Sequence, residues 1–272
     1  MTARASWDAR IRRAEVLSTR FPASREILNF YCVIAKFQKD SHAYFTSRRA
    51  PIPPRTADGT IRGRIDPAIL LPRFSPFLSV VVSNAPAPLA DFTRGLISRE
   101  DSWADLLRIY WENGCRFEPA ADEHSAFCAR AYLQPYAEYV AAQLPLPPHS
   151  TEGAQFCPAC RGMPQAGVLR PEGDGARRAL ICSFCVQEWD YRRIVCPSCG
   201  EERESHICVY AAKEIEYIRL EACETCRTYI ETIDATKDGH AIPIVDELAC
   251  LPLSLWASEQ GYRKLQKNFF GL

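Results

Sequence analysis

Four Cys-x-x-Cys pairs lie between residues 157 and 226, and they constrain this chain more than any other feature. The pairs contain eight of its thirteen cysteines: Cys157/Cys160, Cys182/Cys185, Cys196/Cys199 and Cys223/Cys226. Two residues between cysteines is the spacing with which a tight turn directs two thiolates at one tetrahedral metal ion. The repetition predicts two sites of four thiolates each, with all eight cysteines as metal ligands.

The spacing between the pairs predicts which of them share a metal ion. The 21 residues between Cys160 and Cys182, and the 23 between Cys199 and Cys223, can each hold a β-hairpin, whereas only 10 residues separate Cys185 from Cys196. We therefore expect the first pair to join the second and the third to join the fourth, as in two tandem zinc-ribbon modules. The alternative is a cross-braced arrangement, with the first pair joined to the third and the second to the fourth.

The role of the metals is open at this point. Modules of this size bury too little apolar surface to fold alone, so a bound metal is expected to stabilise each of them. A tetrahedral site of four thiolates suits zinc or iron alike, and iron would add redox capacity. Four cysteine ligands leave no open position on the metal, which argues against Lewis-acid catalysis. Because the sequence also contains no phosphate loop, nucleophile elbow or acid–base pair, we expect no enzymatic activity.

The first 150 residues have the pattern of a helical domain. Apolar residues recur at helical spacing, with helices expected over residues 7–20, from Ser24 as the N-cap, from Ser75, and over residues 89–97, 101–113 and 122–143. Residues 50–67 are rich in proline and predict a loop. The proline-rich run 144–149 predicts a domain boundary near residue 150.

Beyond Cys157 the periodicity changes from helical to strand-like. A hairpin is expected from residues 167–169 and 178–181, with further strands at residues 189–195, 207–211, 215–220 and 229–233 and a closing helix at 245–262. The predicted fold class is α+β. Its parts are a helical domain (1–150), a first four-cysteine module (151–190), a second module (191–241) and a C-terminal helical segment (242–272).

Charge and hydropathy bear on partners and location. The chain has a formal net charge of zero, and residues 151–241 contain 11 Lys/Arg against 15 Asp/Glu. A ribbon that binds phosphates should be basic, so we do not expect a nucleic-acid partner, although Arg177/Arg178 and Arg192/Arg193 are local basic pairs. The sequence has no secretory signal and no apolar run long enough to span a membrane, which predicts a cytoplasmic protein. Reduced thiols are the rule there, so the pairs are interpreted as metal sites rather than disulfides.

The remaining cysteines are expected to have other roles. Cys32, Cys115, Cys128 and Cys250 lie on apolar helical faces and are expected to pack in the core. His206 and Cys208 lie near the second predicted site, but four thiolates already complete it. We do not count these two residues as ligands.

The cysteine region resembles the formate dehydrogenase accessory protein family, FdhE. The resemblance is carried by Cys157-Pro158-Ala159-Cys160 with Met163-Pro164, by the run from Leu180 to Cys199 with Trp189 and Arg193, and by Glu221-x-Cys223-x-x-Cys226-x-x-Tyr229. In the helical half it rests on Tyr132–Ala137, and near the end on Asp246-Glu247-Leu248 and Glu259–Tyr262. Arg161 and Arg227 depart from the family, which often has glycine directly after these cysteines, and Glu231 replaces a frequent lysine.

The resemblance implies a cytoplasmic, non-catalytic maturation factor needed for the activity of respiratory formate dehydrogenase. Members of the family bind the catalytic subunit before its export. By the same resemblance, the eight cysteines would hold two iron ions per chain in two rubredoxin-like modules, with zinc as the alternative. The other function that we consider is a tandem zinc-ribbon protein that binds nucleic acid. Whether the chain forms a homodimer is left open by the sequence.

Overall fold

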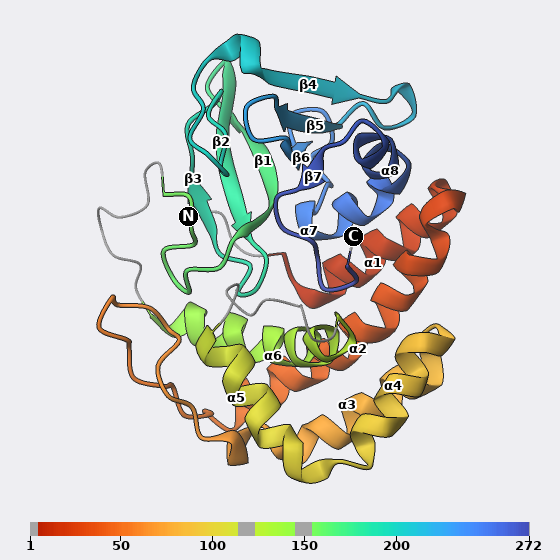
Figure 1. Cartoon of the computed structure of the whole chain (residues 1–272), viewed down its shortest axis with the longest axis vertical. Coiled ribbons are helices and arrows are strands. Elements are labelled where there is room, and N and C mark those ends of the chain that lie inside the picture. The colour runs from red at the N-terminus through yellow and green to blue at the C-terminus, as the bar shows by residue number, and fades with distance from the viewer. Residues whose placement is uncertain (1–4, 114–122, 145–153, 272) are drawn as a thin grey trace.

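The computed structural model describes residues 5–113, 123–144 and 154–271. In these residues a helical half, up to residue 144, and a sheet-bearing half, from residue 154, lie against each other (Figure 1). The expected α+β class is confirmed. Cys115 and the proline-rich run after residue 144 lie outside the described residues.

The helical half is built around one central helix. The helices are α1 (Trp7–Arg20), α2 (Arg25–Ser47), α3 (Leu71–Asn84), α4 (Ala87–Ile97), α5 (Trp103–Asn113) and α6 (Glu123–Gln143). Every residue of α6 from Phe127 to Ala141 is buried, because the other helices and the sheet-bearing half surround it. The apolar periodicity of residues 122–143 nevertheless predicts its bounds to within one residue.

α3 starts four residues before the expected position, whereas α2 starts directly after Ser24, as expected. α3 begins at Leu71 rather than at Ser75, with Pro72 in its first turn and Pro76 inside the helix. Pro72 can occupy the first turn because an amide there has no intrahelical partner. Ser24 precedes α2, but its hydroxyl donates to the carbonyl of Ala249 at 3.2 Å and makes no capping bond.

A single sheet runs through both predicted cysteine modules. Its strands are β1 (Pro164–Glu172), β2 (Gly175–Cys182), β3 (Glu188–Asp190), β4 (Ile207–Ala211), β5 (Ile218–Cys223), β6 (Thr228–Asp234) and β7 (Arg263–Lys264). The order is β3-β2-β1-β6-β5-β4, and β7 pairs with β6. β1 and β2 form the expected hairpin. The parallel pairing of β1 with β6 joins the two modules into one sheet.

Three expected elements of the sheet-bearing half are shorter or broken. The strand expected at residues 189–195 ends at Asp190, and Ile194 has a φ of 54° that no strand accommodates. β5 begins at Ile218 because residues 213–215 form a 3-10 turn. The closing helix is divided into α7 (Pro243–Asp246), a 3-10 turn (Glu247–Cys250) and α8 (Leu251–Glu259).

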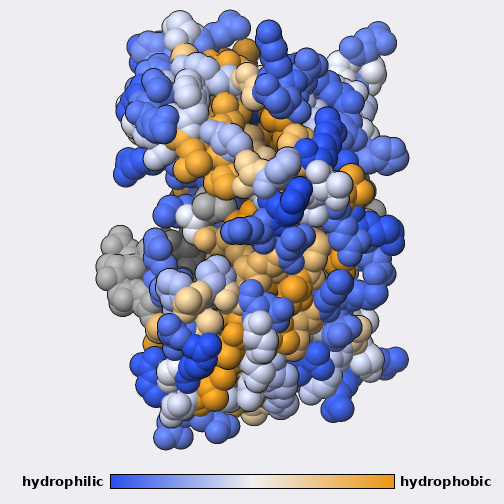
Figure 2. Space-filling model, turned by 90° about the vertical axis from the view of Figure 1, so that its right-hand side faces the viewer, coloured by the Kyte–Doolittle hydropathy of each residue, from blue (hydrophilic) through white to orange (hydrophobic). Residues whose placement is uncertain are grey.

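The two halves share one hydrophobic core. A continuous cluster of buried residues includes Leu28 and Phe77 of the helices together with Val168 and Ile218 of the sheet. Figure 2 shows apolar surface over both halves of the molecule on one side, interrupted by polar side chains. We propose that the predicted boundaries near residues 150, 190 and 241 separate segments of sequence, not units that unfold independently.

Ion pairs fix the position of α1, one within the helical half and one between the two halves. Arg10 of α1 makes two hydrogen bonds to the carboxylate of Glu138 on α6, at 2.8 and 2.7 Å. Arg13, one helical turn later, donates to Asp246 of α7 and to Asp238. Breaking such a pair from one side strands the other charge in the interior, so these contacts fix how α1 lies between the sheet and α6.

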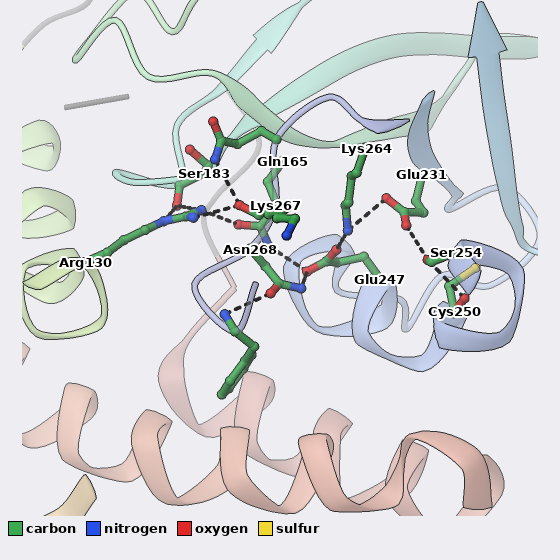
Figure 3. A network of polar contacts seen from close by, with 12 residues as sticks. Arg130, Gln165, Ser183, Glu231, Glu247, Cys250, Ser254, Lys264, Lys267 and Asn268 are labelled. Carbon is green, nitrogen blue, oxygen red and sulfur yellow. Dashed lines mark hydrogen bonds and ion pairs between the residues drawn. The ribbon is translucent and has the colours of Figure 1, made fainter. Parts of the chain in front are cut away.

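A third buried network lies where β1, β6 and β7 meet the 3-10 turn (Figure 3). The ammonium group of Lys264 lies 2.5 Å from Glu247 and 3.1 Å from Glu231. Gln165 and Asn268 donate to the other carboxylate oxygen of Glu247 at 2.8 and 2.9 Å. Glu231 is thus one of two carboxylates facing a lysine from β7.

Among the helices that the structure describes, none combines the length and the apolarity needed to cross a bilayer.

Candidate metal centres

The eight predicted ligands gather into two clusters. Site 1 consists of Cys157, Cys160, Cys182 and Cys185, and site 2 consists of Cys196, Cys199, Cys223 and Cys226. Within each cluster all sulfur atoms lie within 4.8 Å of one another. The structure thus joins the first pair to the second and the third to the fourth, and it does not contain the cross-braced arrangement.

The distances between sulfur atoms test whether a metal fits. The Sγ atoms of Cys157 and Cys185 are 3.6 Å apart and those of Cys160 and Cys182 are 3.4 Å apart. In site 2, Sγ of Cys196 lies 3.7 Å from Sγ of Cys226, and Sγ of Cys199 lies 3.7 Å from Sγ of Cys223. Four sulfurs at about 2.3 Å from a tetrahedral ion would be roughly 3.8 Å from each other, whereas a disulfide requires about 2.05 Å. The cysteines therefore fit two tetrahedral ions and form no disulfides within these clusters.

The backbone at each pair explains how two thiolates reach one point. The residue directly after the second cysteine has a positive φ in all four pairs: Arg161 (59°), Val186 (55°), Gly200 (77°) and Arg227 (56°). At three of these pairs that residue donates its amide to the carbonyl of the first cysteine, at 2.8 to 3.0 Å. A left-handed residue turns the chain back sharply, which is easiest for glycine. We call each Cys-x-x-Cys turn, together with the left-handed residue after it, a knuckle. Arg161 and Arg227 thus adopt the knuckle geometry that glycine would adopt more easily, at the expense of local strain.

Hydrogen bonds to sulfur would stabilise the thiolate form of two of these cysteines. The amide of Phe184 donates to Sγ of Cys182 at 3.3 Å, and the amide of Ser198 donates to Sγ of Cys196 at 3.4 Å. Such donors offset part of the negative charge that four thiolates place on one ion. A close approach is also required at Gly162, where an added Cβ would lie 2.9 Å from Sγ of Cys182.

The protonation of the thiols reflects burial and mutual contact. Burial raises the pKa of Cys157 and Cys185, while hydrogen bonds from Cys157 and Cys182 lower the pKa of Cys160. In site 2, burial raises the pKa of Cys196 to about 12. Burial acts in the same direction on Cys226, but hydrogen bonds to Thr228, Cys199 and Cys196 together outweigh it and lower that pKa to about 7. Grouped thiols of this kind become thiolates together when a cation binds.

Site 1 is enclosed by the helical half. All four of its cysteines are fully buried, in the same hydrophobic cluster as Trp111 and Tyr136. Arg62, from the loop between α2 and α3, donates to the carbonyl of Cys160 at 2.7 Å and to that of Trp111 at 2.6 Å. Its guanidinium lies 4.5 Å from the centre of the Phe184 ring. This arginine was not among the residues that the sequence pointed to, because the loop that carries it has no periodic pattern.

Site 2 opens towards solvent on one side. Cys196 and Cys223 are buried, whereas Cys199 is exposed and Cys226 is half-buried. Between the clusters, Arg178 of β2 reaches Glu221 of β5 at 2.5 Å, so a buried ion pair links the two modules. The two sites share a ligand set but differ strongly in access to water.

His206 and Cys208 lie outside both clusters. The His206 ring is 3.1 Å from the Thr225 hydroxyl, and Cys208 is half-buried on the edge strand β4. Cys32, Cys128 and Cys250 are buried, in keeping with the packing role expected for them. Metal-ion chemistry in this chain can therefore rest on the two tetrads alone, among the residues that the structure describes.

Family models match the part of the chain that carries both tetrads. Residues 156–193 match the model "FdhE, central domain" and residues 194–270 match "FdhE, C-terminal domain". The junction between the two falls within the loop that precedes Cys196.

Relatives extend the similarity beyond that region. The "Protein FdhE homolog" of Aquifex aeolicus is 29% identical, over 96% of this chain and 94% of that protein. The "Protein FdhE homolog" of Pseudomonas aeruginosa is 34% identical, over 43% of this chain and 40% of that protein. The crystal structure of the FdhE protein from Pseudomonas aeruginosa has a TM-score of 0.71 and 21% identity, covering 98% of this chain and 96% of that one. The fold is therefore shared over nearly the whole length.

Proposed function

Because this chain belongs to the FdhE family, we propose that it is an accessory protein needed for the activity of respiratory formate dehydrogenase. It acts in the cytoplasm as a maturation factor, and it binds the catalytic subunit of the enzyme before export. The observation that carries this proposal is the family match over residues 156–270, which contain both cysteine tetrads in one sheet.

Each tetrad holds one metal ion in this proposal, and all eight cysteines are ligands. Iron is the ion that we propose, with zinc as the alternative, because four thiolates at these separations suit either. A bound ion supplies cross-linking of the knuckles and, if it is iron, a redox couple. The residues of the chain orient the thiolates and, at site 1, exclude water. With all four positions held by cysteine, no position is left for a substrate, which favours a helper over an enzyme.

The charge distribution favours a protein partner over nucleic acid. The two basic pairs of the ribbon region are largely neutralised: Arg178 contacts Glu221, Arg177 contacts Asp190 and Arg192 contacts Glu202. A phosphate-binding surface requires cations that are free to meet phosphates. Binding of DNA or RNA that weakens steeply with salt would instead support the alternative, a tandem zinc-ribbon protein.

A deletion strain tests the accessory role. Without this protein, we expect formate dehydrogenase of normal abundance but strongly reduced activity, restored by the wild-type gene. The purified chain should also retain the catalytic subunit from extracts of a strain that makes both. Unaltered formate dehydrogenase activity in the deletion strain would contradict the proposal.

A further inference from the structure

Ile194 has a backbone conformation that its side chain disfavours. Its φ is 54°, and its side chain is 46% exposed. A β-branched residue with positive φ is a rare outlier because its Cβ crowds the following carbonyl. Three of the other four non-glycine residues with positive φ follow a cysteine of a knuckle, and Arg49 follows the end of α2. Ile194 lies at neither kind of position and comes two residues before Cys196.

A buried arginine, Arg178, makes hydrogen bonds to the backbone of the turn that contains Ile194. Arg178 donates from Nη1 to the carbonyl of Arg192 at 3.0 Å and to that of Val195 at 3.3 Å. Arg178 is itself fixed by its ion pair with Glu221 at 2.5 Å. The turn is therefore preorganised by the fold, and Ile194 is kept pointing outwards from it.

Arg193 adds a charge beside this apolar side chain. It is exposed, and no ion pair or hydrogen bond of its side chain is found among the described residues. Its neighbour Arg192 differs, because it contacts Glu202. The loop thus presents an unpaired cation next to an exposed isoleucine.

We propose that Arg193 and Ile194 form a docking tip that binds an acidic segment of a partner protein. Ile194 fills an apolar pocket on the partner, and Arg193 pairs with a carboxylate beside that pocket. The tip loses little conformational freedom on binding, because the fold already holds it in place. Charge complementarity selects the partner's chemistry. The inference rests on the proposed function, since it names the surface through which the catalytic subunit is bound.

Exposure alone does not select this tip. Val209 and Leu255 are 55% and 56% exposed, but neither has a positive φ. Residues held in strained conformations persist where the surrounding structure enforces them, and they cluster at binding sites. Here the enforcing group is Arg178, and the strained residue faces solvent instead of the core.

The test is Ile194→Asn, because asparagine tolerates a positive φ far better than isoleucine. Relief of strain should raise the Tm of the metal-loaded chain by about 2–4 °C. Binding to the purified catalytic subunit should weaken at least tenfold, as expected for an anchor residue. A gain in stability together with a loss of binding is the signature of a residue retained for an interaction.

Four further variants separate the parts of this effect. Arg49→Gly relieves a positive φ at an exposed residue just after α2, and it should leave binding unchanged. Val16→Asn removes a similarly exposed branched side chain from α1, and it too should bind like wild type. Arg193→Glu should weaken binding without altering metal content, and Arg64→Glu, another exposed arginine, should not.

The outcomes are distinct. If the wild-type chain does not bind the catalytic subunit, the proposed function fails and this inference fails with it. If the wild type binds, and both Ile194→Asn and Arg193→Glu bind equally well, the docking tip alone is overturned. If Ile194→Asn loses metal or unfolds, the test rests on Arg193→Glu. Weaker binding by this variant at full metal content supports the docking tip, and unchanged binding overturns it.

Discussion

Arg62 donates a hydrogen bond of 2.7 Å from Nε to the backbone carbonyl of Cys160. This contact joins a loop of the helical half to the second cysteine of the first knuckle, directly before the left-handed residue Arg161. The same guanidinium binds the carbonyl of Trp111 at the end of α5. Site 1 is therefore part of the interface between the two halves, and its metal should stabilise both.

Replacing Arg62 should test that coupling. Arg62→Met removes the donor that Arg62 gives to the buried carbonyls of Cys160 and Trp111, which should lower the free energy of unfolding by about 2–4 kcal/mol. Release of metal from site 1 to a chelator should also become faster, with site 2 unaffected. Urea denaturation and chelator kinetics measure the two effects. The matched control is Arg64→Met, since Arg64 is exposed; equal stability of the two variants would contradict the coupling.

Loss of one ligand should remove one ion and reveal how cooperative the fold is. Wild-type protein purified without oxygen should contain about two metal ions per chain, and Cys157→Ser or Cys196→Ser about one. From the sequence alone, each change is expected to destabilise its own module more than the helical domain. Because site 1 lies in the shared core, we expect Cys157→Ser to lower the unfolding midpoint of the helices as well.

Elemental analysis and circular dichroism measure these two outcomes. Cys208→Ser is the control for replacing a cysteine near site 2 that is outside the tetrad, and it should retain both ions. Equal metal content in wild type and Cys196→Ser would refute the ligand assignment.

The two ions should leave at different rates. Cys199 is exposed in site 2, whereas every cysteine of site 1 is fully buried. A chelator added to the folded protein should remove about half of the metal in a fast phase, and the rest only as the core opens. Alkylation followed by peptide mass spectrometry should find Cys199 and Cys226 modified before Cys157 or Cys160. A single rate for all eight cysteines would show that burial does not control release.

The buried carboxylate of Glu247 should make stability depend on pH. Burial raises the pKa of Glu247, although Lys264 acts against it. A raised pKa in the folded state favours the protonated acid, so this contribution to stability is present below about pH 4.5, the range of a free glutamate, and is lost as pH rises through the folded pKa.

Glu247→Gln imitates the protonated acid and isolates this effect. Relative to wild type, the variant should gain stability between pH 5 and pH 7, by roughly 1.4 kcal/mol for each tenfold rise in the proton affinity of the folded carboxylate. Denaturation of both proteins at pH 5 and at pH 7 measures the difference in stability between variant and wild type. Other titrating groups are common to both proteins, so their contributions cancel in this difference. Gln165, Asn268 and Lys264 contact Glu247, so a pH-independent difference would mean that these partners hold the carboxylate ionised throughout.

Much of the cysteine region follows from local rules. The spacing of Cys160 to Cys182 and of Cys199 to Cys223 predicts the pairing found in the structure. A hairpin returns the chain to its starting point, so neighbouring pairs meet whatever the rest of the molecule does. Helix periodicity likewise locates α1, α2 and α5 to within a few residues, because each of them has one buried face.

Other elements depend on contacts that are distant in sequence. The strand expected through Val195 ends early because the buried side chain of Arg178 holds residues 192 and 195 in a turn. Pro76 lies inside α3, since tertiary packing can outweigh the local preference for a first-turn proline. Neither result can be derived from the residues of the segment itself.

The sequence by itself determined that this chain has two clusters of four cysteines after a helical half, because cysteine spacing and periodicity act over short distances. Only the tertiary structure decided that β1 pairs with β6, that Arg62 closes site 1 and that Cys199 leaves site 2 open. Those features depend on how the helical half packs against the sheet. Two tetrads identical in sequence pattern thus become one sealed and one accessible site, because burial is a property of the whole fold.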